Sequence, residues 1–465
     1  MITSFVFFLL AFTFIGVSSA WRSKKTKNDY YLASNSIQPW LVGLSAVATN
    51  NSGYMFIGVI GYTYSTGLAS IWLMIGWIAG DFISSLFVHK RLRKATHTSG
   101  EVSYAGVLSN WYGQAFGNLQ RIIGLVSLIF LLTYASAQLV AGGKALHVLL
   151  NWPLWSGAVV GAILVSLYCV AGGIRASIWT DAAQSFVMIF AMALLLFVAI
   201  ADLGGTSQAI AKMREVEGFL DWFPKDLALP GLLGGLLFIV GWMVAGLSVI
   251  GQPHIMVRFM TLDDSQNMLR AKIWYYLWFS AFYAMATGVG MQSRIYLSDT
   301  GAFDAELALP TMAQQLLPGI LVGLILAGIF AATMSTADSL ILNCSAAITH
   351  DISPRNIEKP WLIKATTVFI TFIALLFALS NTQSVFNMVI MAWSGLASAF
   401  APILLFLCFG KKPTELACCI ALVTGFLVAL GWRMLGLHSA LYEGLPGILA
   451  GSVILFVANI RKDPA

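Results

Sequence analysis

Thirteen mostly apolar stretches, separated by short polar segments, follow one another along the chain. Each can cross the hydrocarbon core of a bilayer, which is about 30 Å thick and takes roughly 20 residues of helix. They lie near residues 2–21, 38–62, 67–88, 117–148, 154–172, 178–202, 230–251, 272–293, 314–347, 361–380, 384–409, 414–435 and 444–460. Lipid offers no hydrogen-bond partners to the backbone, so stretches of this length are expected to be helical. The pattern predicts an all-α polytopic membrane protein with about 13 transmembrane helices.

Three of these stretches differ from a simple membrane span in length or position. The two longest, 117–148 and 314–347, are expected to tilt, break or protrude into water. The first, 2–21, could be taken for a signal peptide, but it lacks a basic start and a clear small-residue cleavage site. We interpret it as a retained helix.

Composition and charge agree with this class. The chain is 58% hydrophobic and 10% charged, whereas soluble domains contain about 25% charged residues. Basic residues gather in every second connection: Arg22, Lys24, Lys25 and Lys27, then Lys90, Arg91, Arg93 and Lys94, then Arg175, then Arg258, Arg270 and Lys272, then Arg355, Lys359 and Lys364, then Lys411 and Lys412, and finally Arg461 and Lys462. By the positive-inside rule, the N-terminus is expected outside and the C-terminus in the cytoplasm of a plasma (bacterial inner) membrane. The net charge of +6 therefore reflects topology and anionic lipid, and no nucleic-acid partner is expected.

Sequence features of an enzyme are not found. The five cysteines all lie in apolar stretches, and the six histidines form no metal-ligand pair. The chain has no nucleophile elbow, no P-loop and no Rossmann glycine pattern. An enzymatic function is therefore not expected.

The ninth stretch contains an unusual polar run from Ala331 to Ser339. It places the adjacent hydroxyls of Ser335 and Thr336, and the carboxylate of Asp338, inside a segment suited to lipid depth. Charged residues are costly there and usually mark an ion or substrate path. The alternative is a polar contact between helices. Because hard cations prefer oxygen ligands, the run predicts a cation site, with Asp338 on the ion path.

Two stretches show signs of an interrupted helix. The second contains Asn50, Asn51, Ser52 and Gly53 at its middle, and the seventh is glycine-rich and ends in Gly251-Gln-Pro-His254. The two stretches are five helices apart, so they enter the membrane from opposite sides. We expect inverted repeats at about 38–202 and 230–409, with extra helices at 2–21, 414–435 and 444–460, in a single transporter domain spanning 1–465.

Asp181, near the start of the sixth stretch, shares one helical face with Gln184 and Ser185. It either caps the N-terminus of that helix or lies on the path of a cation. The expected topology puts it in the same half of the membrane as Ser335 and Thr336.

These residues resemble the sodium:solute symporter family, and most closely its sodium/proline branch. The resemblance covers roughly residues 20–460 and is carried by Trp179-Thr-Asp-Ala-Ala-Gln184, Gly251-Gln-Pro-His-Ile-Met-Val-Arg-Phe-Met260, Ala332-Thr-Met-Ser-Thr-Ala-Asp-Ser339, the early Leu44-Ser-Ala-Val-Ala and Ser52-Gly53, and Ala392-Trp-Ser-Gly395. It implies a LeuT-type core and Na⁺ as the co-transported ion. It also implies uptake of a small organic solute across the bilayer, with an amino acid such as proline as the first candidate.

The resemblance also assigns roles to individual residues. Sodium ligands would be Ala48 and Asn51 in the broken second stretch and Ala332, Ser335 and Thr336 in the ninth. Asp181 matches an aspartate on the sodium path. The expected solute-binding residues are Asn50, Ser52, Gly53, Tyr54, Tyr134, Trp242 and Gln252.

Departures from the proline branch leave the solute open. That branch has aspartate and methionine where this chain has Asn50 and Asn51, and tryptophan where it has Tyr54. Two proline-contacting aromatic positions align with Ala245 and Val249. A sugar, sialic acid, a carboxylate or pantothenate is the alternative solute, and a membrane sensor with a transporter-like domain is the alternative class. A proton could replace sodium. We expect the monomer to be functional.

Overall fold

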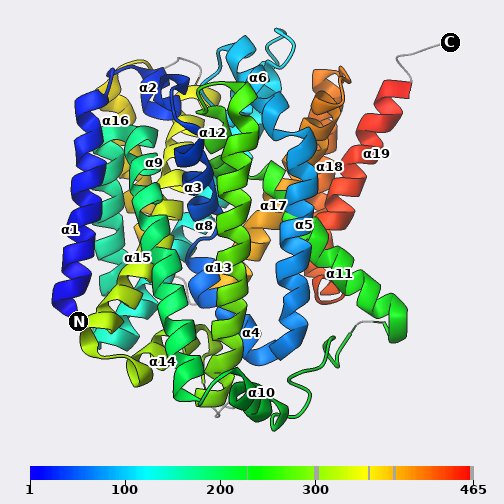
Figure 1. Ribbon diagram of the computed structural model, residues 1–465. Coiled ribbons are helices and arrows are strands. Elements are labelled where there is room, and N and C mark those ends of the chain that lie inside the picture. Colours follow the sequence, from blue (N-terminus) through cyan, green and yellow to red (C-terminus); the bar gives the residue numbers. More distant parts are fainter. Residues whose placement is uncertain (228, 298–302, 354–356, 381–383, 461–465) are drawn as a thin grey trace.

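The computed structural model describes residues 1–227, 229–297, 303–353, 357–380 and 384–460. Within these ranges the chain is helical and has no β-strand, only an isolated bridge between Ile37 and Leu262. The long helices stand roughly parallel in one bundle (Figure 1). α1 begins at the lower end of this view and α19 ends at the upper end, as expected for a chain that crosses a membrane an odd number of times.

The helices fall into a long and a short set. The long ones are α1 (Ile2–Ser18), α3 (Pro39–Asn50), α5 (Ile71–Phe87), α8 (Gly117–Leu150), α9 (Leu154–Asp202), α11 (Gly231–Leu247), α13 (Met268–Tyr296), α15 (Gly319–Ala346), α16 (Pro360–Ser380), α17 (Val385–Cys408), α18 (Glu415–Met434) and α19 (Gly444–Ile460). The short ones are α2 (Lys27–Leu32), α4 (Ile60–Thr66), α6 (His89–Ser99), α7 (Tyr104–Ser109), α10 (Thr206–Arg214), α12 (Pro253–Met260) and α14 (Ala308–Leu316).

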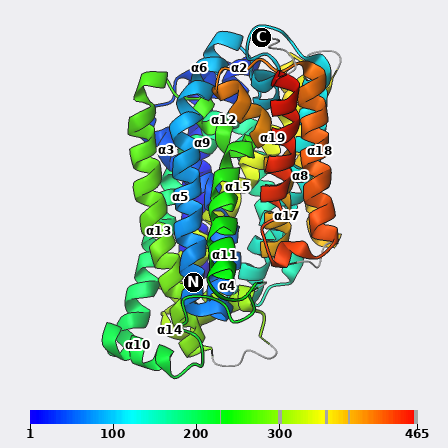
Figure 2. The same ribbon diagram turned by 90° about the vertical axis from the view of Figure 1, so that its right-hand side faces the viewer.

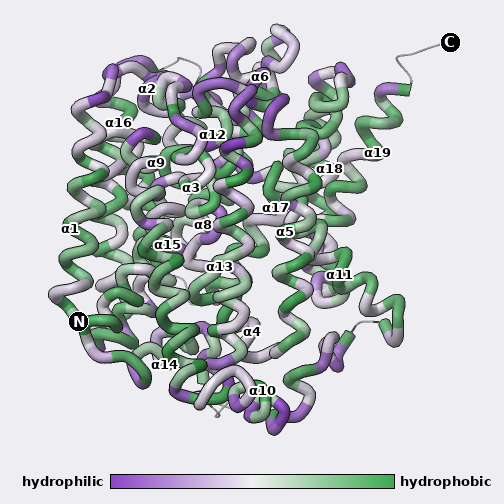
Figure 3. Tube along the Cα trace, in the orientation of Figure 1, coloured by the Kyte–Doolittle hydropathy of each residue, from purple (hydrophilic) through white to green (hydrophobic). Residues whose placement is uncertain are grey.

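Hydropathy divides the bundle into layers. Apolar residues fill its middle, and polar residues gather at its upper and lower ends (Figure 3). In the described part of the chain, nine segments are long and apolar enough to span a membrane. This number is below 13 partly because α9 contains both the 154–172 and 178–202 stretches, and because α3 has only 12 residues. The count of 13 remains a prediction.

α9 turns back on itself at Gly173, whose φ of 56° and ψ of −138° are not helical. Tyr168 and Thr180 would be about 18 Å apart in a straight helix. Both nevertheless lie 3.0 Å from the place where a Cβ on Gly16 would stand. A Cβ at Gly173 itself would lie 2.4 Å from the carbonyl oxygen of Tyr30, so this turn requires glycine.

Both expected interruptions are present. α3 ends at Asn50, Asn51 has φ −88° and ψ 66°, and the chain continues through π-helical turns at Tyr54–Val59 into α4. The seventh stretch ends with a 3₁₀ turn at Ser248–Gly251, and extended backbone at Gln252 separates it from α12. Both breaks lie inside the bundle, where other protein groups can satisfy the freed backbone atoms.

α15 is the central helix, because it packs against α8, α9, α1 and α3 and its residues from Val322 to Leu342 are all buried. Figure 2 shows α17, α18 and α19 along one side of the bundle, where they contact each other. The polar run of α15 therefore faces protein on all sides. This placement brings it against the break in α3.

Candidate functional site

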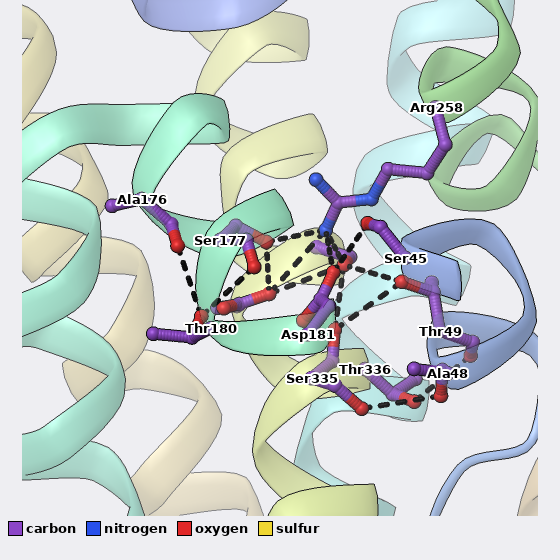
Figure 4. A network of polar contacts seen from close by, with 12 residues as sticks. Ser45, Ala48, Thr49, Ala176, Ser177, Thr180, Asp181, Arg258, Ser335 and Thr336 are labelled. Carbon is purple, nitrogen blue, oxygen red and sulfur yellow. Dashed lines mark hydrogen bonds and ion pairs between the residues drawn. The ribbon is translucent and has the colours of Figure 1, made fainter. Parts of the chain in front are cut away.

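The hydroxyls of α15 meet the backbone at the end of α3 (Figure 4). Ser335 Oγ lies 3.1 Å from the carbonyl oxygen of Ala48 and 3.1 Å from that of Ala332. Thr336 Oγ1 lies 2.9 Å from the carbonyl oxygen of Thr49 and 3.3 Å from that of Ala332. All five residues are fully buried. Two hydroxyls and three carbonyls thus form one cluster of hard oxygen atoms, the ion cluster.

Asn51 and Thr49 differ in how they relate to this cluster. The amide nitrogens of Asn51, backbone and side chain, both donate to the carbonyl oxygen of Val47 at 2.8 and 3.1 Å. The carbonyl of Thr49, which the sequence did not single out, is the one paired with Thr336. Its position in the last turn before a broken helix, where carbonyls lose their partners, is the signal that could have identified it.

Asp181 lies within α9 and against the middle of α3. Its Oδ2 accepts a 2.6 Å hydrogen bond from Ser45 and lies 3.3 Å from Nη2 of Arg258. It sits eight residues after the turn at Gly173, in the interior of the helix. The capping role is therefore wrong, because the helix continues through this position and the carboxylate faces side chains of other helices.

Asp338 joins the same polar group from α15. Its Oδ1 lies 3.5 Å from Nη2 of Arg258 and accepts hydrogen bonds from Ser177 at 2.7 Å and Ser339 at 3.1 Å. Arg258 also donates to the hydroxyls of Ser177 and Ser339. One guanidinium thus faces two buried carboxylates, those of Asp181 and Asp338, which we call the carboxylate pair.

The charge pattern counted Arg258 among the solvated basic residues of a connection, but the structure buries it inside the protein. The side chain is fully buried on α12. A buried charge must be paired, and its two aspartates come from α9 and α15, distant in sequence. Arg175 is likewise buried and pairs with Asp29 at 2.6 Å. Counting basic residues treats every arginine as solvated and cannot detect such pairs.

Hydroxyls connect the ion cluster to the carboxylate pair. Thr49 Oγ1 lies 3.2 Å from the hydroxyl of Ser339, which donates to the carbonyl oxygen of Ser335 at 2.7 Å. A row of oxygen atoms therefore runs from the break in α3 to the carboxylates.

A small cavity lies beside the ion cluster. It has about 10 Å³ of free volume, about what one water molecule needs, so a solute can enter only if the lining residues move apart. The lining side chains are Asn50, Asn51, Tyr54, Met55, Trp77, Tyr134, Phe279, Tyr283, Val389 and Trp393.

The broken segment of α3 is tied to α8 next to this cavity. The hydroxyls of Ser52 and Tyr134 are 3.2 Å apart, and the backbone nitrogen of Gly53 donates to Gln138 Oε1 at 2.9 Å. A Cβ on Gly53 would lie 2.5 Å from the Thr333 side chain, so a larger residue would push α15 away. Ser52 and Gly53 therefore lie against α8, but of Ser52, Gly53 and Tyr134 only Tyr134 lines the cavity.

Asp81 is a functional candidate that the sequence interpretation missed. This buried carboxylate of α5 accepts hydrogen bonds from Tyr275 at 2.6 Å, Tyr276 at 2.8 Å and the Asn50 amide at 3.3 Å. Since Asn50 lines the cavity, Asp81 stands directly behind its wall. The sequence contained a signal for it, because an aspartate in the apolar stretch 67–88 is costly to bury and such residues usually mark functional sites.

Trp242 and Gln252 are not among the residues that line the cavity. Trp242 packs 5.7 Å from Tyr62, which in turn stacks on Phe386 at 5.4 Å, and Phe386 stacks on Tyr54 at 5.3 Å. These four rings form one row, which we call the lid, and its last ring, Tyr54, lines the cavity. Gln252 instead donates to the carbonyl oxygen of Trp393 at 2.9 Å and holds the break before α12 against α17.

Two ion pairs connect segments that are distant in sequence. Glu306, which precedes α14, pairs with Lys144 of α8 at 2.6 Å and accepts from the backbone nitrogen of Phe386 at 2.9 Å, so it anchors the lid. Glu101, which precedes α7, pairs with His350 at 2.8 Å. Burial raises the pKa of Glu101, but the hydrogen bond and charge of His350 outweigh it and hold this pKa below its ordinary value.

Comparisons with known proteins agree with this geometry. The profile of the Sodium:solute symporter family matches residues 30–425. The chain is 29% identical to the Sodium/proline symporter of Escherichia coli (strain K12), covering all of this chain and 94% of that protein. It is 29% identical to the High-affinity proline transporter PutP of Bacillus subtilis (strain 168), covering 95% of each chain. A solved Na⁺-coupled sialic acid symporter, in a substrate-bound outward-open state, superposes with a TM-score of 0.77 at 19% identity, covering all of this chain and 98% of that one. The predicted all-α, LeuT-type fold is confirmed.

Proposed function

The chain belongs to the Sodium:solute symporter family, and from this premise we propose that it imports an amino acid such as proline together with sodium. Na⁺ is the co-transported ion of this family, whose members are transporters and not enzymes. The observation that carries the proposal is the ion cluster, where the hydroxyls of Ser335 and Thr336 stand 3.1 and 2.9 Å from carbonyls at the break in α3. The protein is a multi-pass membrane protein with a small-molecule solute as its partner.

The proposed sodium ligands are Ala48, Asn51, Ala332, Ser335 and Thr336. Neutral hydroxyls and carbonyls suit a hard metal cation better than a proton, which needs a titratable acceptor. The carbonyl of Thr49 is a sixth candidate, because it already lies within hydrogen-bond distance of Thr336. When sodium is bound, the two hydroxyl protons would turn toward other acceptors and leave their oxygens free to coordinate it.

We assign the ion path to Asp181 and Asp338. The row of hydroxyls leading to them supports this assignment, as does their burial. Arg258 pairs with both carboxylates and limits how strongly they can hold a passing cation. An ion path needs ligands that attract the ion without trapping it, and a shared guanidinium provides that balance.

The solute is proposed to bind beside sodium, against Asn50, Ser52, Gly53, Tyr54 and Tyr134. The cavity next to the ion cluster supports this location. Two other expected residues take indirect roles: Trp242 belongs to the lid, and Gln252 positions α17. A sugar, sialic acid, a carboxylate or pantothenate remains the second candidate, because the cavity's side chains differ from those of the proline branch.

Transport would proceed by alternating access around this midplane site. The two broken helices, which we propose to belong to inverted repeats at 38–202 and 230–409, would move against each other. Sodium and solute must tighten each other's binding by the same factor, since coupling is reciprocal. Inward movement of one positive charge adds about 2.3 kcal/mol per 100 mV of membrane potential.

We further propose that the N-terminus is outside, the C-terminus is cytoplasmic and the monomer is the functional unit. The loop charges support this orientation even without Arg175 and Arg258. Cysteines introduced at Lys90 and Glu215 of intact cells would test it. We expect a membrane-impermeant maleimide to label the second from outside and not the first; the reverse labelling would overturn the orientation.

The function is tested by uptake into proteoliposomes. A panel of radiolabelled solutes, with proline, a sugar, sialic acid, a carboxylate and pantothenate, is offered with an inward sodium gradient, a proton gradient, or neither. We expect proline to accumulate only with sodium. Accumulation of another solute would replace proline, and accumulation driven by protons alone would overturn the sodium site. Absence of sodium-dependent uptake of any solute, with normal folding, would favour the sensor.

A further inference from the structure

A groove of about 560 Å³ lies on the side of the bundle where α1, the second half of α9 and the start of α3 meet. Its lining changes from one end to the other. Polar and basic side chains, including Arg22, Ser36 and Gln38, give way to Ile15, Leu41 and Phe186. None of these residues belongs to the ion cluster or to the cavity beside it. We call it the α1–α9 groove.

The basic end of the groove carries an arginine without a carboxylate partner. Arg22 is exposed, its guanidinium lies 5.2 Å from the ring centroid of Trp179, and it makes no ion pair with any described residue. Arg175 also lines this end and is nearly buried, and its Nε has no hydrogen-bond partner among the described residues.

The charge of Arg175 is already compensated. Its Nη2 pairs with Asp29 at 2.6 Å. Burial raises the pKa of Asp29, but the hydrogen bonds from Arg175, the Lys24 backbone and Ser34, together with the charge of Arg175, outweigh burial and hold this pKa below its ordinary value. The net positive charge of the groove therefore comes from Arg22.

The apolar end of the groove continues along α9. Phe186 also lines a second cavity, of about 950 Å³, which lies between α1, α9, α13 and α15 and has an almost wholly apolar wall. Phe186 and Phe190 are 55% and 61% exposed, so this wall faces outward from the bundle. Phe190 lies about 16 Å along the helix from Trp179. That is about half the thickness of a hydrocarbon core of roughly 30 Å, the depth that one acyl chain covers.

The basic end lies at the edge of the apolar layer. Arg22 directly follows the apolar stretch 2–21, and Trp40 and Trp179 line the groove at the same level. Tryptophans prefer the boundary between headgroups and acyl chains. Figure 3 shows polar residues at this end of the bundle.

We propose that the α1–α9 groove binds one anionic phospholipid, with its phosphate at Arg22 and an acyl chain along Phe186 and Phe190. An anionic headgroup supplies the negatively charged partner that Arg22 lacks. A zwitterionic lipid would bring its own cation close to two arginines and bind less tightly. The lipid would fill the space between α1 and the start of α3, the helix whose other end forms the ion cluster.

Native mass spectrometry of the intact protein, released from micelles with equal phosphatidylglycerol and phosphatidylcholine, tests this proposal without any transport assay. We expect the wild type to retain one phosphatidylglycerol in preference to phosphatidylcholine. Arg22→Gln should lower that preference about tenfold. Arg91→Gln is the matched control, because Arg91 is also exposed and lies 5.9 Å from an aromatic ring, that of Phe409, outside the groove. Equal retention of both lipids, or equal loss in both variants, would overturn the proposal.

Two further experiments distinguish binding of the acyl chain from binding of the headgroup. Phe186→Ala should weaken retention of both lipids, whereas Phe369→Ala, at a 58% exposed phenylalanine of α16, should not. Unchanged lipid retention in the Phe186→Ala variant would show that the acyl chain does not lie in the groove. Inorganic phosphate should not displace phosphatidylglycerol; displacement would identify a small-anion site instead of a lipid site.

Discussion

The ion cluster and the cavity beside it are built in different ways. The ion cluster uses backbone carbonyls of α3 and two small hydroxyls of α15. The cavity is walled by large side chains from α3, the π-helical turns, α5, α8, α13 and α17, most of them aromatic. The first site depends on how the backbone runs, and the second depends on which side chains converge.

This difference explains why the two sites diverge unequally from the proline branch. A backbone carbonyl remains available as a ligand when its own side chain is substituted. The ion cluster therefore depends only on the two hydroxyl side chains and on the break in α3. The cavity is built from side chains, so single substitutions alter its wall, and Asn50 and Tyr54 are two positions where it departs from the residues expected for the proline branch. The region still contains a carboxylate, however, because Asp81 Oδ2 lies 3.3 Å from the amide nitrogen of Asn50.

The largest effect is expected from Arg258→Gln. It leaves the carboxylate pair buried without its cation, and breaking a buried ion pair costs about 3–5 kcal/mol. Uptake should be lost and thermal unfolding of the purified protein should shift to lower temperature. The double variant Arg258→Gln/Asp338→Asn should regain part of this stability. Arg91→Gln serves as the surface control, and a single variant as stable as this control would show that Arg258 does not balance the aspartates.

The second effect concerns the ion cluster itself. Ser335→Ala or Thr336→Ala removes one ligand with little change in volume. We expect the sodium concentration for half-maximal uptake to rise tenfold or more, on the order of 1.4 kcal/mol. Solute affinity should fall mainly at low sodium and recover at saturation, because coupling is reciprocal.

Thr371→Ala is the matched control for this pair. Thr371 is a buried threonine of α16 whose hydroxyl bonds only to its own helix, at 2.9 Å from the carbonyl oxygen of Thr367. It should keep the sodium dependence of the wild type. If Ser335→Ala and Thr336→Ala behaved like this control, the sodium site would have to be sought at Asp338.

The third prediction moves to the cavity. Asp81→Asn should raise the solute concentration for half-maximal uptake about tenfold, or ~1.4 kcal/mol. The change removes the carboxylate charge and replaces one of the two oxygens that accept from Asn50, Tyr275 and Tyr276 with an amide nitrogen that cannot accept. Sodium dependence at saturating solute should change by less than about twofold. Tyr276→Phe, which removes one of the three hydrogen bonds, should give a smaller effect in the same direction. A change in sodium dependence alone would place Asp81 with the ion cluster.

Exchanging the carboxylate between helices sharpens this test. Asn50→Asp alone creates two adjacent carboxylates and should impair uptake more than Asp81→Asn. The double variant Asn50→Asp/Asp81→Asn carries one carboxylate again, now on α3 as in the proline branch, and should recover. A double variant no better than the worse single variant would count against Asp81 as the replacement.

The smallest effect is expected from Asp181→Asn. Arg258 keeps Asp338 as its partner, so the protein should remain folded. The half-saturating sodium concentration should rise about fivefold, near 1 kcal/mol, measured by uptake over a sodium series. Unchanged sodium activation would reduce Asp181 to a structural link between Ser45 and Arg258.

The sequence alone determined the helical membrane class, both helix breaks and the polar run of α15. These features depend on local composition: apolar length, clustered Asn, Ser and Gly, and hydroxyls out of place in a lipid-depth segment. A resemblance in ordered motifs added the family. Such features can be recognised without knowing which residues pack against each other.

Only the tertiary structure decided which charged groups are paired. Arg258 looked like a loop residue until α9 and α15 supplied its aspartates, and Asp81 drew no attention until α13 and Asn50 surrounded it. The lid needed Phe386 of α17 to reach Tyr54, more than 300 residues earlier in the chain. The cost of a buried charge or the wall of a cavity is set by neighbours distant in sequence, and no local pattern records them.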